Sequence, residues 1–493
     1  MPRGMANVTA ARPDSQATGV GLPVSRSLAA VQNEIWDVAV VGGGNAALVA
    51  ALTARRAGAR VVLLERSPRW MRGGNTRHTR NIRCVHRAAD AYNTGPYLED
   101  ELWRDLCAVG DGPSNERLAR FTVQASETAP QLMSSLGVRW QPPLASTLHL
   151  DRTNRFFLGG GKALVNVYYR AAEAMEITAI YDSAVTALEF DGLRCCALIV
   201  KSGESAFRLR ARSVVCASGG FEANVDWLRQ YWGPAANNYI IRGTPYNDGS
   251  ILRELMDAGA ATAGHQLGFH AIAVDARAPR FDGGIATRLD VVPFGIAVNK
   301  DGQRFYDEGE DIWPKRYATW GGLIGQQPDQ IAFGLWDSKV SRLFLPPMYP
   351  PASAGSVGEL AQQLGLDPTS VSSTVKQFNA AVLGDGVFDA TRLDTCRTVG
   401  LDPPKSHWAQ RVDTPPYYGI PMRPGVTFTY MGVAVDDDAR VLCADGKRFD
   451  NVFAAGEIMS GNILSTGYLA GFGLTIGTVW GRHAGAEAAR YVG

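Results

Sequence analysis

The sequence predicts an α/β protein in which a Rossmann-like nucleotide-binding domain is interrupted by a second, inserted domain. Near the start, a buried strand, a glycine-rich turn, a helix and a second strand follow one another within about thirty residues, which makes a complete βαβ unit. Near the end, at 451–457, another apolar strand leads into a glycine turn. The intervening stretch 265–424 is rich in prolines, aromatic residues and arginines, and this change in composition indicates the insertion.

The first βαβ unit is predicted from three consecutive segments. The apolar run 35–41 is typical of a buried parallel strand. The alanine-rich stretch 48–57 favours a helix, which Gly58 ends, and 60–64 supplies the second strand.

Later segments extend the same domain. The pattern predicts helices within 97–137 and over 163–174, and a second buried strand over 213–217. The first residues are rich in Ala, Ser and Arg, a composition that resembles a transit peptide, but they lack the apolar core of a secretory signal. We therefore predict a disordered N-terminal extension over 1–34, the nucleotide-binding domain over 35–264 and 425–493, and the inserted domain over 265–424.

Composition narrows the class of function. Of the 493 residues, 46% are apolar and 20% are charged, which is typical of a soluble globular protein. The net charge of +1 gives no long-range attraction to nucleic acid. The seven cysteines form no CxxC pair and no metal-ligand spacing, so no metal site is predicted and a reducing cytoplasm is the expected location.

The glycine turn after the first strand carries the strongest chemical signal. Gly42, Gly44 and Ala47 fit the pattern G-x-G-x-x-A. Gly42 permits a tight turn, Gly44 lets a pyrophosphate approach the backbone, and Ala47 keeps helix and strand close. Glu65 follows the second strand, where an acid accepts hydrogen bonds from ribose hydroxyls. The arrangement predicts a dinucleotide site.

Two further segments favour FAD over NAD. Gly73–Thr76 comes directly after the βαβ unit and would run beside an extended cofactor. The segment 454–457, together with the glycines of 467–473, indicates a second backbone contact near the end of the chain. Wrapping from both ends of the sequence favours a cofactor that stays bound throughout turnover.

Together these segments resemble the fumarate reductase and succinate dehydrogenase flavoprotein superfamily over 35–493. The resemblance rests on G-G-N-[ST] at 73–76, G-G-G-x-A-L at 159–164, A-[ST]-G-G-F at 217–221, A-A-G-E at 454–457 and N-x-x-G-x-R-F-x-x-E at 299–308. It implies a GR2-type Rossmann-like FAD-binding domain with an inserted α+β capping domain.

With the glycine turn, the resemblance implies a set of FAD contacts along the whole chain. The predicted contacts are Gly42, Gly44, Asn45, Ala46, Ala47, Glu65, Arg66, Gly73, Gly74, Asn75, Thr76, Arg80, Gly160, Gly161, Ala184, Val185, Ala217, Ser218, Gly219, Asp248, Gly456, Glu457, Gly471, Gly473 and Leu474. The position that carries covalent flavin in some members falls near Asn75, so FAD is expected to be non-covalent. His78 is the alternative attachment point.

Within the superfamily, residues 73–84 and 306–317 look most like the tricarballylate dehydrogenase flavoproteins. They are also similar to the flavoprotein half of an enzyme of aerobic cobalamin synthesis. The first resemblance implies that tricarballylate is dehydrogenated to cis-aconitate, with flavin N5 accepting the hydride. It also implies an iron–sulfur membrane protein as electron acceptor, which would bring a cytoplasmic enzyme to the membrane surface.

Catalytic roles follow from the same resemblance. A capping-domain arginine acts as the proton shuttle in fumarate reductases, and Arg316 is the matching arginine. His270 falls near the substrate-binding histidine of the family. Tyr430 and Tyr468 stand near the positions of a second substrate histidine and a carboxylate-binding arginine. This chain is therefore not expected to be a fumarate reductase or succinate dehydrogenase, and the two hydroxyls are predicted to contact the substrate instead.

A polycarboxylate also needs cationic anchors, and arginine suits bidentate recognition of carboxylates. Arg80 and Arg83 follow the flavin segment, and Arg277, Arg280 and Arg288 lie in the inserted domain. Arg288 is included among the predicted site residues.

Two alternatives remain open from the sequence. One is a flavin oxidoreductase of the same family acting on a tetrapyrrole-pathway or secondary-metabolite substrate. The other is a flavin-binding electron-transfer or sensing subunit, against which the arginine-rich insertion argues.

Overall fold

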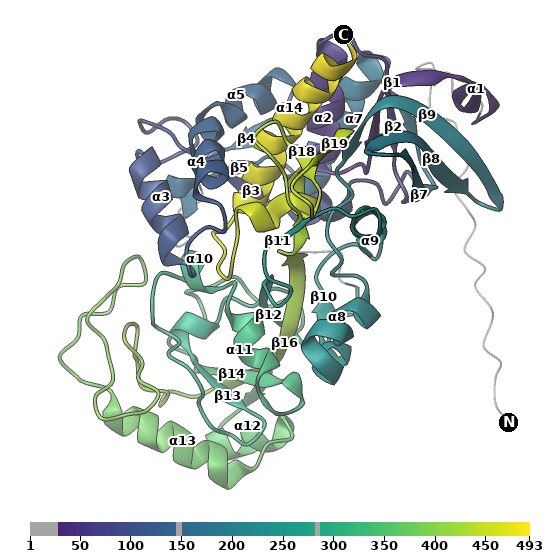
Figure 1. Cartoon of the computed structure of the whole chain (residues 1–493). Helices are drawn as coiled ribbons and strands as arrows, with labels where there is room; N and C mark the ends of the chain where they lie inside the picture. Colours follow the sequence, from purple (N-terminus) through teal and green to yellow (C-terminus); the bar gives the residue numbers. More distant parts are fainter. Residues whose placement is uncertain (1–27, 144–149, 282–285) are drawn as a thin grey trace, which may run out of the picture.

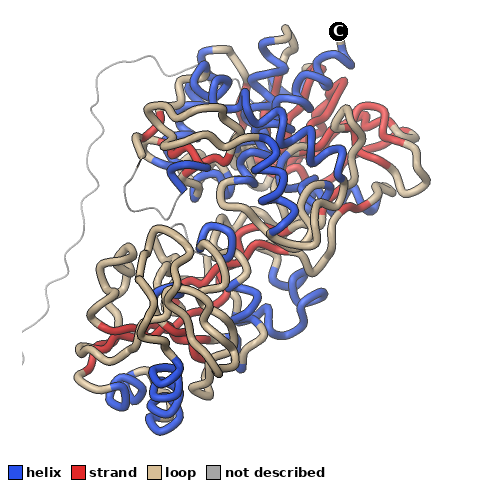
Figure 2. The backbone as a smooth tube through the Cα atoms, turned by 90° about the vertical axis from the view of Figure 1, so that its left-hand side faces the viewer, coloured by secondary structure: helices blue, strands red, loops and turns tan. Residues whose placement is uncertain are grey.

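The computed structural model describes residues 28–143, 150–281 and 286–493. It has two lobes, which both ribbon views separate (Figures 1 and 2). The upper lobe in Figure 1 combines the first third of the chain with the C-terminal helix α14 (Phe472–Val492), and the lower lobe holds the middle of the chain, including α13 (Pro368–Ala381). The predicted fold, a Rossmann-like domain with an inserted capping domain, is confirmed.

The upper lobe is built on a mainly parallel sheet with the strand order β18-β19-β9-β1-β2-β6. Strands β19, β9, β1, β2 and β6 run parallel, and β18 pairs with β19 in the antiparallel direction. The strands are β1 (Ile35–Val41), β2 (Val61–Leu64), β6 (Thr178–Ile180), β9 (Ser205–Cys216), β18 (Arg440–Leu442) and β19 (Arg448–Ala454). Because the carboxyl ends of parallel strands meet at one edge, the segments that follow β1, β2, β9 and β19 gather there.

The predicted elements of this lobe are present with small shifts. The first helix, α2, begins at Asn45 and ends at Arg56, and α7 (Gly160–Ala174) begins within the glycine run. The helical stretch divides into α3 (Glu99–Ala108), α4 (Glu116–Ala125), η2 (Ser126–Thr128) and α5 (Ala129–Ser135). The strand predicted at 213–217 is the end of the longer β9, which forms an antiparallel meander with β7 (Ser183–Asp191) and β8 (Arg194–Ser202).

Smaller elements complete the upper lobe. The turn η1 (Gly74–His78) follows β2, and β3 (Asn81–Arg83), β5 (Asn154–Phe157) and β4 (Trp140–Gln141) form a three-stranded sheet. The others are α6 (Leu150–Thr153), α8 (Val225–Trp232), η3 (Gly233–Asn238), α9 (Ser250–Asp257), η6 (Gly456–Asn462) and the pair β11 (Thr262–Ala263) with β17 (Gly432–Val433).

The lower lobe contains its own sheet, with the order β10-β16-β14-β13. Its strands are β10 (Ile240–Ile241), β12 (Phe269–Asp275), β13 (Ile296–Asn299), β14 (Ala332–Asp337), β15 (Ala352–Ala354) and β16 (Tyr417–Thr429), and both β12 and β15 pair with β16. Strand β10 precedes residue 265 and β16 continues past residue 424. The capping sheet therefore extends beyond the predicted insertion at both ends.

The helices of the lower lobe cover this sheet. They are η4 (Val292–Phe294), α10 (Trp313–Arg316), α11 (Trp320–Gly325), η5 (Pro328–Gln330), α12 (Val357–Gln363) and α13. A second apolar core, with Val298, Leu335 and Phe378 among its members, is separate from the main core of the molecule. The insertion thus has an apolar core of its own.

Helices α2 and α14 pack unusually closely. A Cβ at Gly481 would lie 2.5 Å from the carbonyl oxygen of Ala46, and one at Gly485 would lie 2.3 Å from that of Ala50. The side-chain amide of Asn45 donates to the carbonyl of Leu474 at 3.2 Å. The glycines let the two backbones touch, so the start of each helix has a fixed position relative to the other.

The described part of the chain begins with α1 (Leu28–Asn33), a short helix inside the segment predicted to be an extension. Val31 is buried, and its carbonyl accepts a hydrogen bond from the indole of Trp36 at 3.3 Å. The remainder of that prediction, over 1–27, lies outside the described residues. No helix among the described residues is long and apolar enough to cross a membrane.

Replacing Gly481 with Ala should destabilise the protein, because the added methyl group meets the backbone of α2. Overpacking of this kind costs about 1–3 kcal/mol, so thermal unfolding should shift to lower temperature. The matched control is Gly384→Ala, since a Cβ there meets nothing within 4 Å. Equal melting temperatures for the two variants would contradict the close packing.

Candidate active site

A cavity opens where the carboxyl ends of the parallel strands meet. Its wall includes 42–46 after β1, 64–67 at the end of β2, 217–219 after β9 and 455–457 after β19. The N-cap residues of α2 and α14, Gly44 and Gly471, also lie on it. Two helix N-termini facing one cavity suit a ligand that carries phosphates.

The turn after β1 is shaped for close backbone contact. Gly42 has a φ of 116°, and a Cβ there would lie 2.3 Å from the carbonyl oxygen of Ala217. A Cβ at Gly43 would lie 2.2 Å from a carboxylate oxygen of Glu65. Only glycine fits at these two places, and the geometry matches the predicted pyrophosphate position.

Glu65 is held rigidly at the cavity wall. Its two carboxylate oxygens accept the backbone N–H groups of Ser67 at 2.8 Å and Gly73 at 3.2 Å. Burial raises the pKa of Glu65, and these hydrogen bonds partly offset the effect. A fixed, buried acid beside a phosphate-binding turn fits the predicted contact with a ribose.

The turn η1 forms another part of the wall, and Asn75 fastens it to the rest of the site. The Asn75 amide nitrogen donates to Glu222 at 2.6 Å and to the carbonyl of Thr427 at 2.8 Å, and its oxygen accepts the N–H of Thr244 at 2.9 Å. Glu222 and Glu457 are buried against each other, and their mutual repulsion adds to burial in raising the pKa of Glu457. At least one proton is therefore held between these two acids.

Five predicted cofactor contacts are absent from the cavity wall, and packing explains the three glycines among them. The N–H of Gly161 donates to the carbonyl of Thr79 at 2.8 Å, and a Cβ there would lie 2.0 Å from the carbonyl oxygen of Thr76. Gly160, Gly161 and Gly73 therefore position η1 against α7. Ala184 also lies off the wall, whereas its neighbour Val185 is on it.

The helix residue Ala47 is likewise buried between α2 and its neighbours rather than on the wall. This position agrees with the packing role that the glycine pattern predicts for it. The remaining predicted contacts line the cavity: Gly42, Gly44, Asn45, Ala46, Glu65, Arg66, Gly74, Asn75, Thr76, Arg80, Val185, Ala217, Ser218, Gly219, Asp248, Gly456, Glu457, Gly471, Gly473 and Leu474.

One part of the cavity is strongly cationic. Three arginines line it: Arg80 from the segment after η1, Arg242 directly after β10, and Arg288 from the lower lobe. Burial, followed by repulsion from Arg288, lowers the pKa of Arg80 to about 9. The neighbouring acid is Asp290, which binds Arg288 at 2.5 Å and accepts the indole N–H of Trp313 at 2.8 Å. Two of these guanidinium groups, those of Arg80 and Arg288, thus act on the carboxylate of Asp290.

His270 lies among these arginines. Its ring stacks on Tyr468 with centroids 3.9 Å apart and meets Tyr317 edge-on at 5.4 Å. Burial, then the charges of Arg242 and Arg288, hold the pKa of His270 well below its ordinary value, so the ring is neutral at pH 7. Neither ring nitrogen has a hydrogen-bond partner within the described residues, and both are available to a ligand.

The structure places Arg316 and Tyr430 differently from the prediction. Arg316 is not on the cavity wall and instead binds Glu310 at 2.9 Å. Tyr430 is fully buried outside the wall and donates to the carbonyl of Gly467 at 3.0 Å. This arrangement does not support a proton shuttle at Arg316 or a substrate contact at Tyr430, and both roles stay predictions from the sequence.

Tyr317 occupies the position expected of Arg316. It lies one helical turn after the buried Trp313, to which its N–H bonds at 2.8 Å, so the two side chains share the inward face. Arg316, next to it in the chain, is not on the wall. The Tyr317 hydroxyl makes no hydrogen bond within the described residues, and its ring packs below Arg288 at 5.7 Å. The spacing of Trp313 and Tyr317 was the sequence signal for this orientation.

The other arginines proposed from the sequence have structural contacts. Arg83 is buried and donates to the carbonyl of Ala470 and to Tyr97. Arg277 is bound to Asp275 at 2.7 Å, and Arg280 donates to the carbonyl of Asn237. None of these three lines the cavity.

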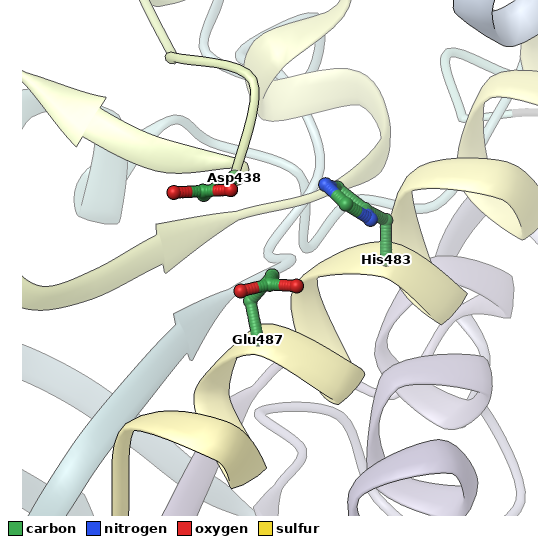
Figure 3. Close-up of side chains that lie close together, drawn as sticks. All are labelled: Asp438, His483 and Glu487. Atoms are coloured by element: carbon green, nitrogen blue, oxygen red, sulfur yellow. The ribbon is translucent and has the colours of Figure 1, made fainter.

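A separate group of potential metal ligands lies on the surface of the upper lobe. Figure 3 shows Asp438 facing His483 and Glu487 of α14. Arg490 contacts both acids, and Arg448 lies 3.9 Å from Asp438. These cations already balance the carboxylates, so the group is interpreted as an ion-pair cluster that ties α14 to the loop before β18.

The fold and the cavity together define a capped, dinucleotide-dependent oxidoreductase. The phosphate-suited helix N-termini, the fixed acid and the closely approached glycines make a cradle that fits an extended dinucleotide. The chain belongs to the FAD binding domain family, which it matches over residues 37–474.

Curated relatives align over almost the whole chain. The probable fumarate reductase Ifc3 of Shewanella frigidimarina is 26% identical over 95% of this chain and 77% of its own length. The urocanate reductase of Eggerthella lenta is 26% identical over 92% of this chain and 74% of its own length. The NADH:acrylate oxidoreductase of Vibrio harveyi is also 26% identical, but this chain spans only 51% of it.

Solved structures share the fold. The open conformation of a flavocytochrome c3 fumarate reductase has a TM-score of 0.72 at 22% identity, covering 94% of this chain and 80% of that one. The 3-ketosteroid-Δ4-(5α)-dehydrogenase of Rhodococcus jostii RHA1 has a TM-score of 0.70 at 22% identity, covering 95% and 99%. The chain is an FAD-dependent oxidoreductase.

Replacing Glu65 with Ala should weaken FAD binding while leaving the protein folded. A hydrogen bond to a charged group contributes about 1.5–3 kcal/mol, which corresponds to roughly a tenfold to hundredfold rise in Kd. Fluorescence titration of the apoprotein with FAD measures this change. The control is Glu173→Ala, because Glu173 is exposed on α7 and away from the cavity. An unchanged Kd would remove Glu65 from the cofactor site.

Proposed function

We propose that this enzyme dehydrogenates a C–C single bond of tricarballylate, or of a similar polycarboxylate, to give the alkene, which is cis-aconitate for tricarballylate. The observation that carries the proposal is the group of three arginines, Arg80, Arg242 and Arg288, around the neutral His270. Fumarate, urocanate and acrylate, which the names of the three relatives described above give, are carboxylates, and this supports the proposed class of substrate.

The charge balance of the cavity favours a substrate with several carboxylates. Asp290 forms an ion pair with Arg288 and also acts on the charge of Arg80, so one carboxylate serves two guanidinium groups in a largely buried place. A buried positive charge that is only partly balanced is costly, and a bound carboxylate relieves that cost through bidentate hydrogen bonds. An apolar substrate would bury these charges without pairing them.

When bound, FAD supplies the hydride acceptor for this oxidation. We also propose that FAD is held without a covalent bond, because Asn75 stands at the attachment position and its amide is fully engaged by Glu222, Thr427 and Thr244. His78, the alternative attachment residue, lies on the cavity wall.

The proton from the neighbouring carbon is assigned to the hydroxyl oxygen of Tyr317. Burial raises the pKa of Tyr317, while the nearby guanidinium groups, Arg288 first, oppose that rise. These cations therefore stabilise the phenolate that must accept the proton. The same hydroxyl, once protonated, can return the proton in the reverse direction.

His270 and Tyr468 would orient the substrate between the arginines. The neutral ring of His270 offers one donor and one acceptor, and its stacking on Tyr468 fixes its plane. The hydroxyl oxygen of Tyr468 accepts a hydrogen bond from the N–H of Gly473 at 3.0 Å, so the hydroxyl hydrogen of Tyr468 points away from Gly473. In this proposal His270 and Tyr468 bind and align the substrate, and the capping lobe excludes water from it.

The electrons must then leave the enzyme. An iron–sulfur protein at the membrane surface is the proposed acceptor, and the cytoplasm is the proposed location of the enzyme. The alternative substrates, a tetrapyrrole-pathway intermediate or a secondary metabolite, would be oxidised by the same flavin chemistry. A direct assay with tricarballylate therefore distinguishes them from the proposed substrate.

The proposed reaction predicts anaerobic bleaching of the oxidised enzyme by tricarballylate. The absorbance of the oxidised flavin should fall once enzyme and tricarballylate are mixed, and cis-aconitate should be recovered in an amount equal to that of the flavin reduced. Arg288→Ala should raise the tricarballylate concentration needed for half-maximal bleaching at least tenfold. An intact oxidised spectrum in saturating tricarballylate would exclude this substrate.

Tyr317→Phe should lower the rate of flavin reduction by about 10²–10⁴-fold, the usual contribution of a general base. In the native enzyme the rate should rise with pH between 7 and 9, because the phenolate is the active form and its pKa lies above this range. The rise should vanish in Tyr317→Phe. Arg316→Ala is the neighbouring control and should keep most of the activity. If Arg316→Ala were the slower variant, the proton assignment would revert to Arg316.

A further inference from the structure

The segment 69–78 separates two hollows. On its inner side, Gly74, Asn75, Thr76 and His78 line the flavin cavity. On its outer side, a second hollow is lined by Arg69, Trp70, Arg72, Arg77, Lys162 and Asn166. Lys162 and Asn166 come from α7, one turn apart, and so project from the same face of that helix.

The outer hollow is cationic. Four of its lining residues carry positive charge, and no acid stands among the described residues that line it. Arg72 donates to Asn166 at 3.0 Å and lies 4.3 Å from the centroid of the Tyr169 ring. Arg77 donates to the carbonyl of Trp70 at 2.6 Å. The two guanidinium groups are thus held in place by uncharged partners.

The arginines repel each other at this site. Burial, then the charge of Arg72, lowers the pKa of Arg77. The nearby acid Glu65 directs its oxygens inward, to the N–H groups of Ser67 and Gly73. Cations that are ordered, partly buried and not neutralised form a favourable place for an anion.

An aromatic ring stands at the rim of the same hollow. The side chain of Trp70 is 75% exposed, although burial of its large ring would be favourable. Stacking of a base on an aromatic ring contributes about 1–3 kcal/mol. A ligand with phosphates and a flat base would use both the cations and the indole.

We propose that the outer hollow binds a nucleoside polyphosphate, with its phosphates on Arg69, Arg72, Arg77 and Lys162 and its base on Trp70. This site is distinct from the flavin cavity and does not depend on the proposed substrate. Because segment 69–78 forms the wall between the two hollows, binding outside alters the surroundings of the flavin inside.

The test uses the full-length, flavin-saturated protein, so that the flavin cavity is filled. Isothermal titration calorimetry in 150 mM salt should give saturable, one-to-one binding of ATP, and weaker binding of pyrophosphate and of adenosine. Visible circular dichroism of the flavin should change with the same midpoint, without release of FAD.

Variants locate the site. Arg69→Ala combined with Lys162→Ala should weaken ATP binding at least tenfold, since neither side chain has a hydrogen bond or ion pair within the described residues whose loss would disturb the fold. Trp70→Ala should weaken ATP binding but leave pyrophosphate binding unchanged. Lys376→Ala, an exposed lysine of α13, is the matched control and should bind like the native protein.

Three results would overturn the proposal. The first is the absence of ATP binding at millimolar concentration, and the second is ATP binding that survives the double substitution. The third is equal affinity for ATP and pyrophosphate together with no effect of Trp70→Ala, which would mean that the hollow recognises phosphate alone.

Discussion

The contact between α2 and α14 is the constraint on which the cofactor site depends. These helices come from opposite ends of the sequence, and each begins at the same cavity wall. Gly481 and Gly485 bring their backbones into contact, so the angle and offset of the two N-termini are fixed by sterics rather than by flexible side chains. A phosphate site made from two helix dipoles needs this precision, because the dipole effect falls off within one turn.

Around that fixed frame, the charged groups come from separate elements. Arg80 follows η1, Arg242 follows β10 and Arg288 belongs to the capping lobe. Each alone would be an ordinary arginine, and only the packing of the two lobes concentrates the three charges. The cost of burying them is reduced by Asp290 and by the aromatic ring of Tyr317, both of which contact Arg288. The remaining positive charge favours an anionic ligand.

The nucleotide-binding elements were predictable because their constraints are local. The strand before Gly42, the helix after it and the acid at Glu65 depend on residues within one βαβ unit. The cationic pocket was less predictable, since Arg242 and Tyr317 acquire their roles only through long-range packing. Arg316 illustrates the difficulty. The family motif identifies the right segment of the chain, but the residue of that segment that faces the cavity is determined by helical periodicity, which places Tyr317 on the same face as the buried Trp313. Gly160 and Gly161 show a related difficulty, because a glycine that lets a neighbouring turn approach has the same sequence signature as one that lets a ligand approach.

Strand β16 links the two lobes mechanically. Most of its length pairs with β12, β14 and β15 in the capping sheet, yet its last residues, including Thr427 and Phe428, line the flavin cavity. The capping lobe is therefore not connected by a loop alone, because strand β16 of its sheet also forms part of the wall of the cofactor cavity. The carbonyl of Thr427 in turn accepts a hydrogen bond from Asn75 in η1, the turn beside the cofactor cavity. We therefore expect a change in the position of the cap to alter the absorption spectrum of the bound flavin.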